Sequence, residues 1–309
     1  LPLEGEDGPP AASDVYGVVS DRAGAWYVTT PDSVLHVSAA GRVRRVATLG
    51  GASFRGIAIS PDGSALFVVD MFNDKIRRVE VATGAGTTLA GSGETGSADD
   101  VGGAARFSCP YDVAISRDGS ALFVADLDNH KIRRVEVATG AVTTVAGSTA
   151  GSADGVAGAA QFHNPSGVAI SPDGSALFVA DFASQKIRRV EVTTGAVTTV
   201  AGSTEGSADG VGGMAQFNYP AGIAISPDGN ALFVADQCNH KIRRVEVATG
   251  AVTTVASSGV RGSADGVGGA AHFRHQLLVA ISTDGSDLLV CTSDSLRHVC
   301  VSAPPPPPP

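Results

Sequence analysis

The apolar and polar positions of this chain follow a short repeating pattern that predicts β-strands. In the unit that begins at Gly167, an apolar run at 168–170 is followed by a second apolar run at 176–180. A third segment at 186–192 mixes charged and aliphatic residues, and a fourth at 196–201 is rich in β-branched residues. Short runs of this kind are typical of strands. We therefore predict four antiparallel strands in the unit.

Tight turns separate the predicted strands. The segment Ser171–Gly174 reads Ser-Pro-Asp-Gly, with proline at the second turn position and glycine at the last, as tight turns favour. Thr193–Gly195 ends in a glycine that can adopt positive φ, which suits a hairpin. These signals fix where each strand ends.

The whole unit recurs about every 55 residues. Its first strand and turn return at 56–63, 112–119, 167–174 and 222–229, with a divergent copy at 278–285. A fixed period of this length indicates a repeat architecture, and four antiparallel strands per repeat are typical of a β-propeller blade. Because repeated residues serve the fold, we expect function where the copies differ.

Six blades are predicted, so we expect an all-β, six-bladed β-propeller. The first blade is compact and spans 16–49, and the last has strands at 278–282, 288–292 and 296–302. The last blade lacks its own fourth strand, because the chain then turns to proline, which has no N–H to donate to a sheet.

Three segments follow from this pattern. They are an N-terminal extension at 1–13, the propeller at 14–303 and a polyproline II tail at 304–309. The first residue is leucine rather than methionine, so we expect that a preceding segment such as a signal peptide has been removed.

Composition and charge argue against two classes of protein, those that bind nucleic acid and those that span a membrane. The formal net charge is −9, which disfavours nucleic acid as a partner, since phosphate binding needs clustered Lys and Arg. No stretch is long and apolar enough to be a membrane span. The 39 glycines and 16 prolines are typical of a turn-rich β protein.

The chain resembles the NHL-repeat proteins. The resemblance is carried by Val-Ala-Asp followed by Asn-His-Lys-Ile, at 129–132 and 239–242, and by Pro-x-Gly-Val-Ala-Ile upstream. It covers roughly 14–303 and implies six blades. It does not imply one activity, because the family includes RNA-binding modules, protein-interaction modules, a lyase and extracellular proteins.

Acidic and histidine side chains are the candidates for chemistry. The aspartates that end each second strand are expected to accept backbone N–H bonds from the following loop; they are Asp70, Asp126, Asp181 and Asp236. A metal site from His163, His272 and His275 is an alternative, since the lyase relatives hold zinc with histidines on one face. No spacing favours that alternative. We identify no catalytic, cofactor-binding or metal-binding residues.

Long Gly-Ser-Ala-Asp loops are expected on one face of the propeller. Their phenylalanines, together with one in blade two, are predicted to anchor the loops from below; these are Phe54, Phe107, Phe162, Phe217 and Phe273. A binding rim is the alternative. The recurring Lys-Ile-Arg-Arg-Val-Glu segments predict charge pairs between blades.

The four cysteines divide into two groups. Cys291 and Cys300 lie on adjacent predicted strands of the last blade, and a short turn between them would place them opposite each other, so we predict a disulfide. Cys109 and Cys238 are expected on the long-loop face, either free or bonded to another subunit.

The proline tail resembles the hydroxyproline-rich glycoproteins of algal and plant cell walls. That resemblance implies O-linked glycans on the tail residues, which are Pro304, Pro305, Pro306, Pro307, Pro308 and Pro309. A plain linker is the alternative.

The predicted function is that of an extracellular structural or adhesive propeller without enzymatic activity. We expect it to be a subunit of a glycosylated fibre or of a cell-wall or surface assembly. Its partners would be further copies, assembled head-to-tail through the open edge of the last blade, or other extracellular matrix proteins. The alternatives are a metal-dependent lyase or hydrolase, and a protein or RNA recognition module.

Overall fold

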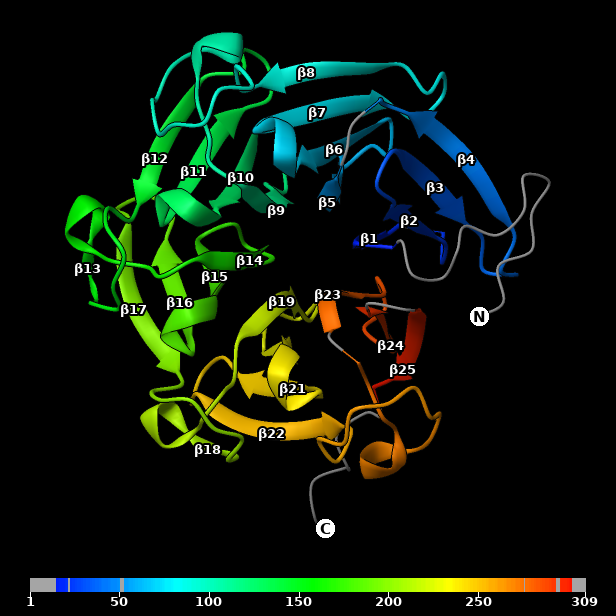
Figure 1. Cartoon of the computed structure of the whole chain (residues 1–309), viewed down its shortest axis with the longest axis vertical. Helices are drawn as coiled ribbons and strands as arrows, with labels where there is room; N and C mark the ends of the chain where they lie inside the picture. Colours follow the sequence, from blue (N-terminus) through cyan, green and yellow to red (C-terminus); the bar gives the residue numbers. More distant parts are fainter. Residues whose placement is uncertain (1–14, 22, 51–52, 275, 293–294, 302–309) are drawn as a thin grey trace.

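Six antiparallel sheets surround a central axis in the computed structural model (Figure 1). The structure describes residues 15–301, apart from 22, 51–52, 275 and 293–294. The predicted six-bladed, all-β propeller is confirmed, and within the described ranges the helical segments are single short turns. No helix in these ranges has the length and apolar character needed to cross a membrane.

The first three sheets have four strands each. Blade one consists of β1 (Gly17–Ser20), β2 (Trp26–Thr29), β3 (Ser33–Val37) and β4 (Val43–Thr48). Blade two consists of β5 (Phe54–Ile59), β6 (Ala65–Asp70), β7 (Lys75–Glu80) and β8 (Gly86–Ala90). Blade three consists of β9 (Pro110–Ile115), β10 (Ala121–Asp126), β11 (Lys131–Glu136) and β12 (Val142–Ala146).

Blades four and five add a two-residue strand from the long loop to their outer edges. Blade four consists of β13 (Gly155–Val156), β14 (Pro165–Ile170), β15 (Ala176–Asp181), β16 (Lys186–Glu191) and β17 (Ala196–Ala201). Blade five consists of β18 (Gly210–Val211), β19 (Pro220–Ile225), β20 (Ala231–Asp236), β21 (Lys241–Glu246) and β22 (Ala251–Ala256).

Blade six has three strands in the described chain, as predicted. They are β23 (Gln276–Ile281), β24 (Asp287–Thr292) and β25 (Leu296–Cys300), in that order from the axis outward. β23 contacts β1, so the ring closes between the last blade and the first. No described strand pairs with the outer edge of β25.

The core lies between neighbouring blades rather than within one. Each apolar cluster combines side chains from two adjacent sheets, as where Phe123 of β10 packs with Val168 and Val179 of blade four. A strand with neighbouring blades on both faces must be apolar on both. This requirement explains why β10, β15 and β20 are buried along their whole length.

Glycine lets the innermost strands approach closely at the axis. A Cβ on Gly17 would lie 2.1 Å from the Arg55 carbonyl oxygen, and one on Gly167 would lie 2.4 Å from that of Ala221. Both distances are far inside van der Waals contact, so these positions admit only glycine without backbone movement.

Candidate functional site

A buried arginine fastens each long loop to its blade. Arg188 of β16 is fully buried, and its Nη1 donates to Asp181 Oδ2 at 2.7 Å. Its Nη2 donates to Asp154 Oδ1, in the Gly-Ser-Ala-Asp loop, at 2.8 Å. The guanidinium also donates to two loop carbonyls and lies 5.3 Å from the centre of the Phe162 ring. One side chain therefore joins the sheet, the loop and the loop's aromatic anchor.

Blades three and five repeat this arrangement. Arg133 joins Asp126 to Asp99, and Arg243 joins Asp236 to Asp209. Blade six keeps part of it, since Arg297 binds Asp265 at 2.6 Å. The Gly-Ser-Ala-Asp motif is thus explained by loop attachment rather than by catalysis.

The expected role of the strand-ending aspartates was wrong in its detail. Asp181 accepts the N–H of His163 at 2.7 Å, and that residue belongs to the loop before the blade, not the loop after the strand. Asp126 and Asp236 accept N–H groups from the equivalent loops. We also missed the buried arginine. Its signal was that the aspartate, the first arginine of Lys-Ile-Arg-Arg and the Gly-Ser-Ala-Asp loop occur together in blades three to five.

The prediction that phenylalanines anchor the long loops is confirmed for the four that lie in those loops, each of which lies against the guanidinium of a third-strand arginine. Phe54 belongs to the innermost strand β5 instead of a long loop. All five are buried, with at most 1% exposed; they are Phe54, Phe107, Phe162, Phe217 and Phe273. They line no binding rim.

The second arginine of each Lys-Ile-Arg-Arg segment pairs within its own strand. Arg78 Nη2 lies 2.9 Å from Glu80 Oε1, and Arg134, Arg189 and Arg244 pair in the same way with the glutamate two residues on. The predicted charge ladder between blades was wrong. Residues two apart on a strand share a face, so each arginine forms its ion pair with the glutamate of its own strand instead of with a neighbouring blade.

Side chains at the histidine position of the repeat connect adjacent blades. His130 Nδ1 accepts the N–H of Asn164 at 3.2 Å, and Gln185 Oε1 accepts that of Tyr219 at 2.6 Å. Asp74 does the same for Cys109. In each case the accepting residue has positive φ and the donor stands just before the next innermost strand. His130 is therefore a loop-packing residue, as predicted.

The structure gives no support to the alternative metal site. His163 packs edge-on against His130, with ring centres 5.8 Å apart, and His275 lies outside the described residues. Among the described residues, one group has ligand atoms close enough together to surround an ion, and this group contains neither His163 nor His272.

The predicted disulfide is not formed. Cys291 is paired with Leu296 across the hairpin, while Cys300 is paired with Asp287, so the two thiols stand at opposite ends of the strand pair. Both are free, with Cys291 buried and Cys300 exposed. The hairpin turns two residues nearer to Cys291 than the prediction required, since Cys291 pairs with Leu296 and Thr292 N donates to Ser295 O. Cys109 and Cys238 are free thiols as well.

The first three blades depart from the repeat at the residue that precedes the repeat glycine of the innermost strand. Tyr16, Arg55 and Tyr111 hold equivalent places at the start of innermost strands, where blades four and five have Ser166 and Ala221. The Arg55 guanidinium lies 4.1 Å from the Tyr16 ring centre and 5.7 Å from that of Tyr111. Because innermost strands begin where the long loops end, this cluster lies on the long-loop face.

The side chain of Arg55 has hydrogen-bond donors that the described residues leave unused. Its Nε contacts the sulfur of Met71 at 3.4 Å, and its terminal nitrogens donate to no acceptor in the described part of the chain. A guanidinium held between two aromatic rings, with its fork of donors unused, suits a carboxylate or phosphate.

Asp112 takes the place of a repeat glycine beside this cluster. Its two carboxylate oxygens accept the N–H groups of Val113 and, across the blade boundary, Val168. Burial raises the pKa of Asp112 to about 7, and these two hydrogen bonds lower it only in part. The sequence signal was visible, since Asp112 stands where Gly56, Gly167 and Gly222 stand in the other blades.

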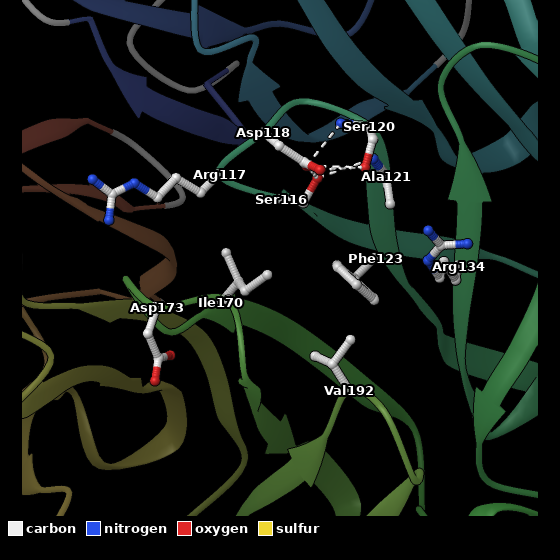
Figure 2. A pocket seen from close by; sticks show the side chains of 11 residues that line it. Ser116, Arg117, Asp118, Ser120, Ala121, Phe123, Arg134, Ile170, Asp173 and Val192 are labelled. Carbon is white, nitrogen blue, oxygen red and sulfur yellow. Dashed lines mark hydrogen bonds between the residues drawn. The ribbon is translucent and has the colours of Figure 1, made fainter.

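A hollow lies on the face opposite the long loops, between blades three and four (Figure 2). It has a volume of about 330 Å³ and is lined by Phe123, Ile170 and Val192, with Arg117, Arg134 and two aspartates at its polar side. Hydrogen bonds from serines of the same turn hold the pKa of Asp118 at about 2, so that carboxylate is ionised and already bonded.

The hollow exists because Arg117 replaces a turn proline. At three other blade boundaries a proline packs on the next blade's turn glycine, as Pro172 does at 3.2 Å from a Cβ placed on Gly229. A Cβ placed on Gly174 meets nothing within 4 Å, because the preceding turn has Arg117.

The predicted glycan residues 304–309 and the N-terminal extension lie outside the described residues.

Comparisons with known proteins agree with the fold. Residues 217–244 match the NHL repeat family. The chain is 32% identical over 240 residues to NHL repeat-containing protein 2 of Bos taurus, a match that takes in 66% of this chain and 32% of that protein. It is 28% identical over 259 residues to the Arabidopsis thaliana protein SUPPRESSOR OF QUENCHING 1, chloroplastic, which takes in 78% of this chain and 24% of the plant protein.

Solved structures include the same architecture. An auxiliary nutrient binding protein from Bacteroides thetaiotaomicron superposes with a TM-score of 0.73 at 16% identity, over 93% of this chain and 69% of that one. This chain spans a third or less of the two curated relatives, so their names describe larger proteins. The chain contains an NHL repeat and folds as a six-bladed β-propeller.

Proposed function

We propose that this propeller is an extracellular structural or adhesive unit that joins further copies through the open edge of blade six. The observation that carries the proposal is the outer edge of β25, which no described strand covers, whereas the outermost strand of every other described blade is a fourth or fifth strand. An uncovered edge presents backbone donors and acceptors that favour pairing with another chain.

The hydrogen bonds between β24 and β25 indicate which backbone N–H groups of β25 point away from the sheet. Val301 N donates inward to Ser286 O, and Thr292 N donates to Ser295 O. Donors alternate in direction along an antiparallel strand. The N–H groups of Leu296, His298 and Cys300 therefore point away from β24.

Sedimentation velocity of the full chain over a range of concentrations tests the proposal. EDTA and a reducing agent are included, so that neither metal ions nor disulfides join molecules. We expect concentration-dependent assembly, which Cys300→Pro reduces because proline removes an outward N–H. Cys238→Ser, at an exposed thiol on blade five, should assemble normally. A strictly monomeric protein at all concentrations would contradict the proposal.

The extracellular location and the glycans are supported by the proline run at 304–309. Mass spectrometry of native material tests this part. We expect hydroxyproline bearing pentose on the tail. Unmodified prolines would remove the glycan proposal and leave the assembly proposal standing.

A second candidate function is recognition of an anionic ligand at the cluster of Arg55, Tyr16 and Tyr111. It is favoured by Arg55, whose terminal nitrogens are unused between two tyrosine rings. Calorimetric titration with small dicarboxylates and inorganic phosphate tests it, with Arg55→Gln expected to abolish binding. Arg78→Gln, which changes an exposed arginine on a third strand, is the matched control.

A further inference from the structure

Three side chains of blade six converge on one face of the last hairpin. Asp287 begins β24, and His298 and Cys300 lie on β25. The register pairs Asp287 with Cys300 and Leu289 with His298, which places all three candidate side chains on the same side of the sheet.

The ligand atoms of these residues are close together. One atom from each of Asp287, His298 and Cys300 lies within 4.8 Å of the other two. His298 Nε2 is 3.1 Å from Asp287 Oδ1, and Cys300 Sγ is 3.9 Å from His298 Nδ1. His298 and Cys300 are exposed and Asp287 is half-buried, so an ion can reach them from solvent.

The same three positions hold different residues in the regular blades. In blade three the register pairs Ala121 with Glu136 and Phe123 with Arg134. The equivalents of Asp287, His298 and Cys300 are therefore alanine, arginine and glutamate. Blades two to five all keep this set, which is Ala65, Arg78 and Glu80; Ala121, Arg134 and Glu136; Ala176, Arg189 and Glu191; Ala231, Arg244 and Glu246.

In the regular blades this set provides the ion pair within the third strand. Blade six exchanges all three members for side chains that can bind a metal ion, at positions that touch one another. The fold does not require the exchange, because four blades fold with the alanine, arginine and glutamate.

We propose that Asp287, His298 and Cys300 bind a zinc-class divalent ion at the outer edge of blade six. Thiolate, imidazole and carboxylate are the ligands that zinc takes in proteins, whereas calcium and magnesium prefer oxygen alone. Three protein ligands leave a fourth position for water. Binding requires the Cys300 thiolate, so the ion displaces the thiol proton to solvent.

Titration with cobalt tests the site directly. The full chain is freed of metal with EDTA, desalted, reduced and titrated with Co²⁺. We expect one equivalent to give a near-ultraviolet thiolate-to-cobalt charge-transfer band and visible bands of tetrahedral cobalt, which Zn²⁺ then bleaches. Cys300→Ser should abolish the charge-transfer band.

The affinity for zinc is measured by competition with a chromophoric chelator. His298→Ala and Asp287→Ala should each weaken binding more than about tenfold, the size of effect seen even for residues that only orient a ligand. Cys238→Ser, which removes an exposed thiol elsewhere, should bind as the parent does.

A consensus variant separates metal binding from folding. Asp287→Ala, His298→Arg and Cys300→Glu together restore the set of the regular blades, so this protein should fold and bind no cobalt. The proposal is overturned if the folded parent shows no charge-transfer band, or if the band survives Cys300→Ser. Either result would leave the His298–Asp287 contact as a surface ion pair only.

Discussion

The guanidinium of Arg188 lies 5.3 Å from the centre of the Phe162 ring, and both side chains are fully buried. A cation over the face of an aromatic ring is attracted to it, and more strongly when both are removed from water. Arg188 belongs to the third strand of blade four, whereas Phe162 ends the loop that enters the blade. The pair therefore makes the loop part of the folded blade, and equivalent pairs do so in blades three, five and six.

Removing Arg188 should strongly destabilise the propeller. Arg188→Ala would leave the Asp181 carboxylate buried without its cation, and breaking a buried pair in this way costs about 3–5 kcal/mol. Chemical denaturation measures the free energy of unfolding.

The neighbouring arginine is the control. Arg189 pairs with Glu191 at the surface, with about a third of each side chain exposed, and such pairs contribute about 0.2–1 kcal/mol. If Arg189→Ala and Arg188→Ala had equal effects, the loop attachment described above would be wrong.

The sequence predicted the fold well because its signals are local and are repeated. Turn residues, strand lengths and the 55-residue spacing of the repeat fixed six blades and the missing strand of the last one. A turn such as Ser171–Gly174 forms from its own hydrogen bonds, with Ser171 Oγ donating to Asp173 at 2.6 Å. No distant contact is needed to predict it.

Contacts between distant segments were harder to predict. Arg188 was predicted to take part in charge pairs between blades, and its actual partner Asp154 was missed because it is 34 residues away. The disulfide failed because it depended on the register of one hairpin, and a shift in register changes every cross-strand neighbour. The cluster of Arg55 and Asp112 appears only when different blades are compared position by position.

Glycine at the axis should be indispensable. Gly167→Ala would place Cβ 2.4 Å from the Ala221 carbonyl oxygen, so the innermost strands of blades four and five would have to move apart. Overpacking of this kind costs about 1–3 kcal/mol. Gly103→Ala, in open space on a loop, is the control and should change the free energy of unfolding little. A benign Gly167→Ala would show that the inner strands can separate easily.

Asp112 should make the propeller less stable as the pH rises. Its pKa is about 7 in the folded protein, against 3.8 for the unfolded chain. Between these values the folded protein holds a proton that the unfolded chain has lost, so the free energy of unfolding falls with increasing pH. The fall from Asp112 should be on the order of 4 kcal/mol between pH 4 and pH 8.

Urea denaturation at several pH values measures this dependence. Asp112→Asn should make the dependence shallower by the part that Asp112 contributes, because the amide cannot ionise. Burial also raises the pKa of Asp126 and Asp181 to about 6, so part of the slope should remain in this variant. Asp173→Asn alters an exposed carboxyl whose pKa of about 2 lies below this range, and the slope above pH 4 should persist in that variant. A parent protein whose stability is constant from pH 4 to pH 8 would contradict the assignment.

Filling the hollow between blades three and four should stabilise the protein. Arg117→Pro restores the residue that the equivalent turns have at Pro61, Pro172 and Pro227, and it removes no backbone hydrogen bond, since the N–H of Arg117 donates to no described acceptor. Proline at a compatible position stabilises by about 0.4–1 kcal/mol, because it restricts the unfolded chain. The new ring would also contact Gly174.

The control variant is Arg117→Ala. It loses the weak hydrogen bond to the Pro172 carbonyl without restricting the chain, so it should not be stabilising. If Arg117→Pro lowered the free energy of unfolding, the turn of blade three would differ from the turns it resembles, and the hollow would have another cause than the missing proline.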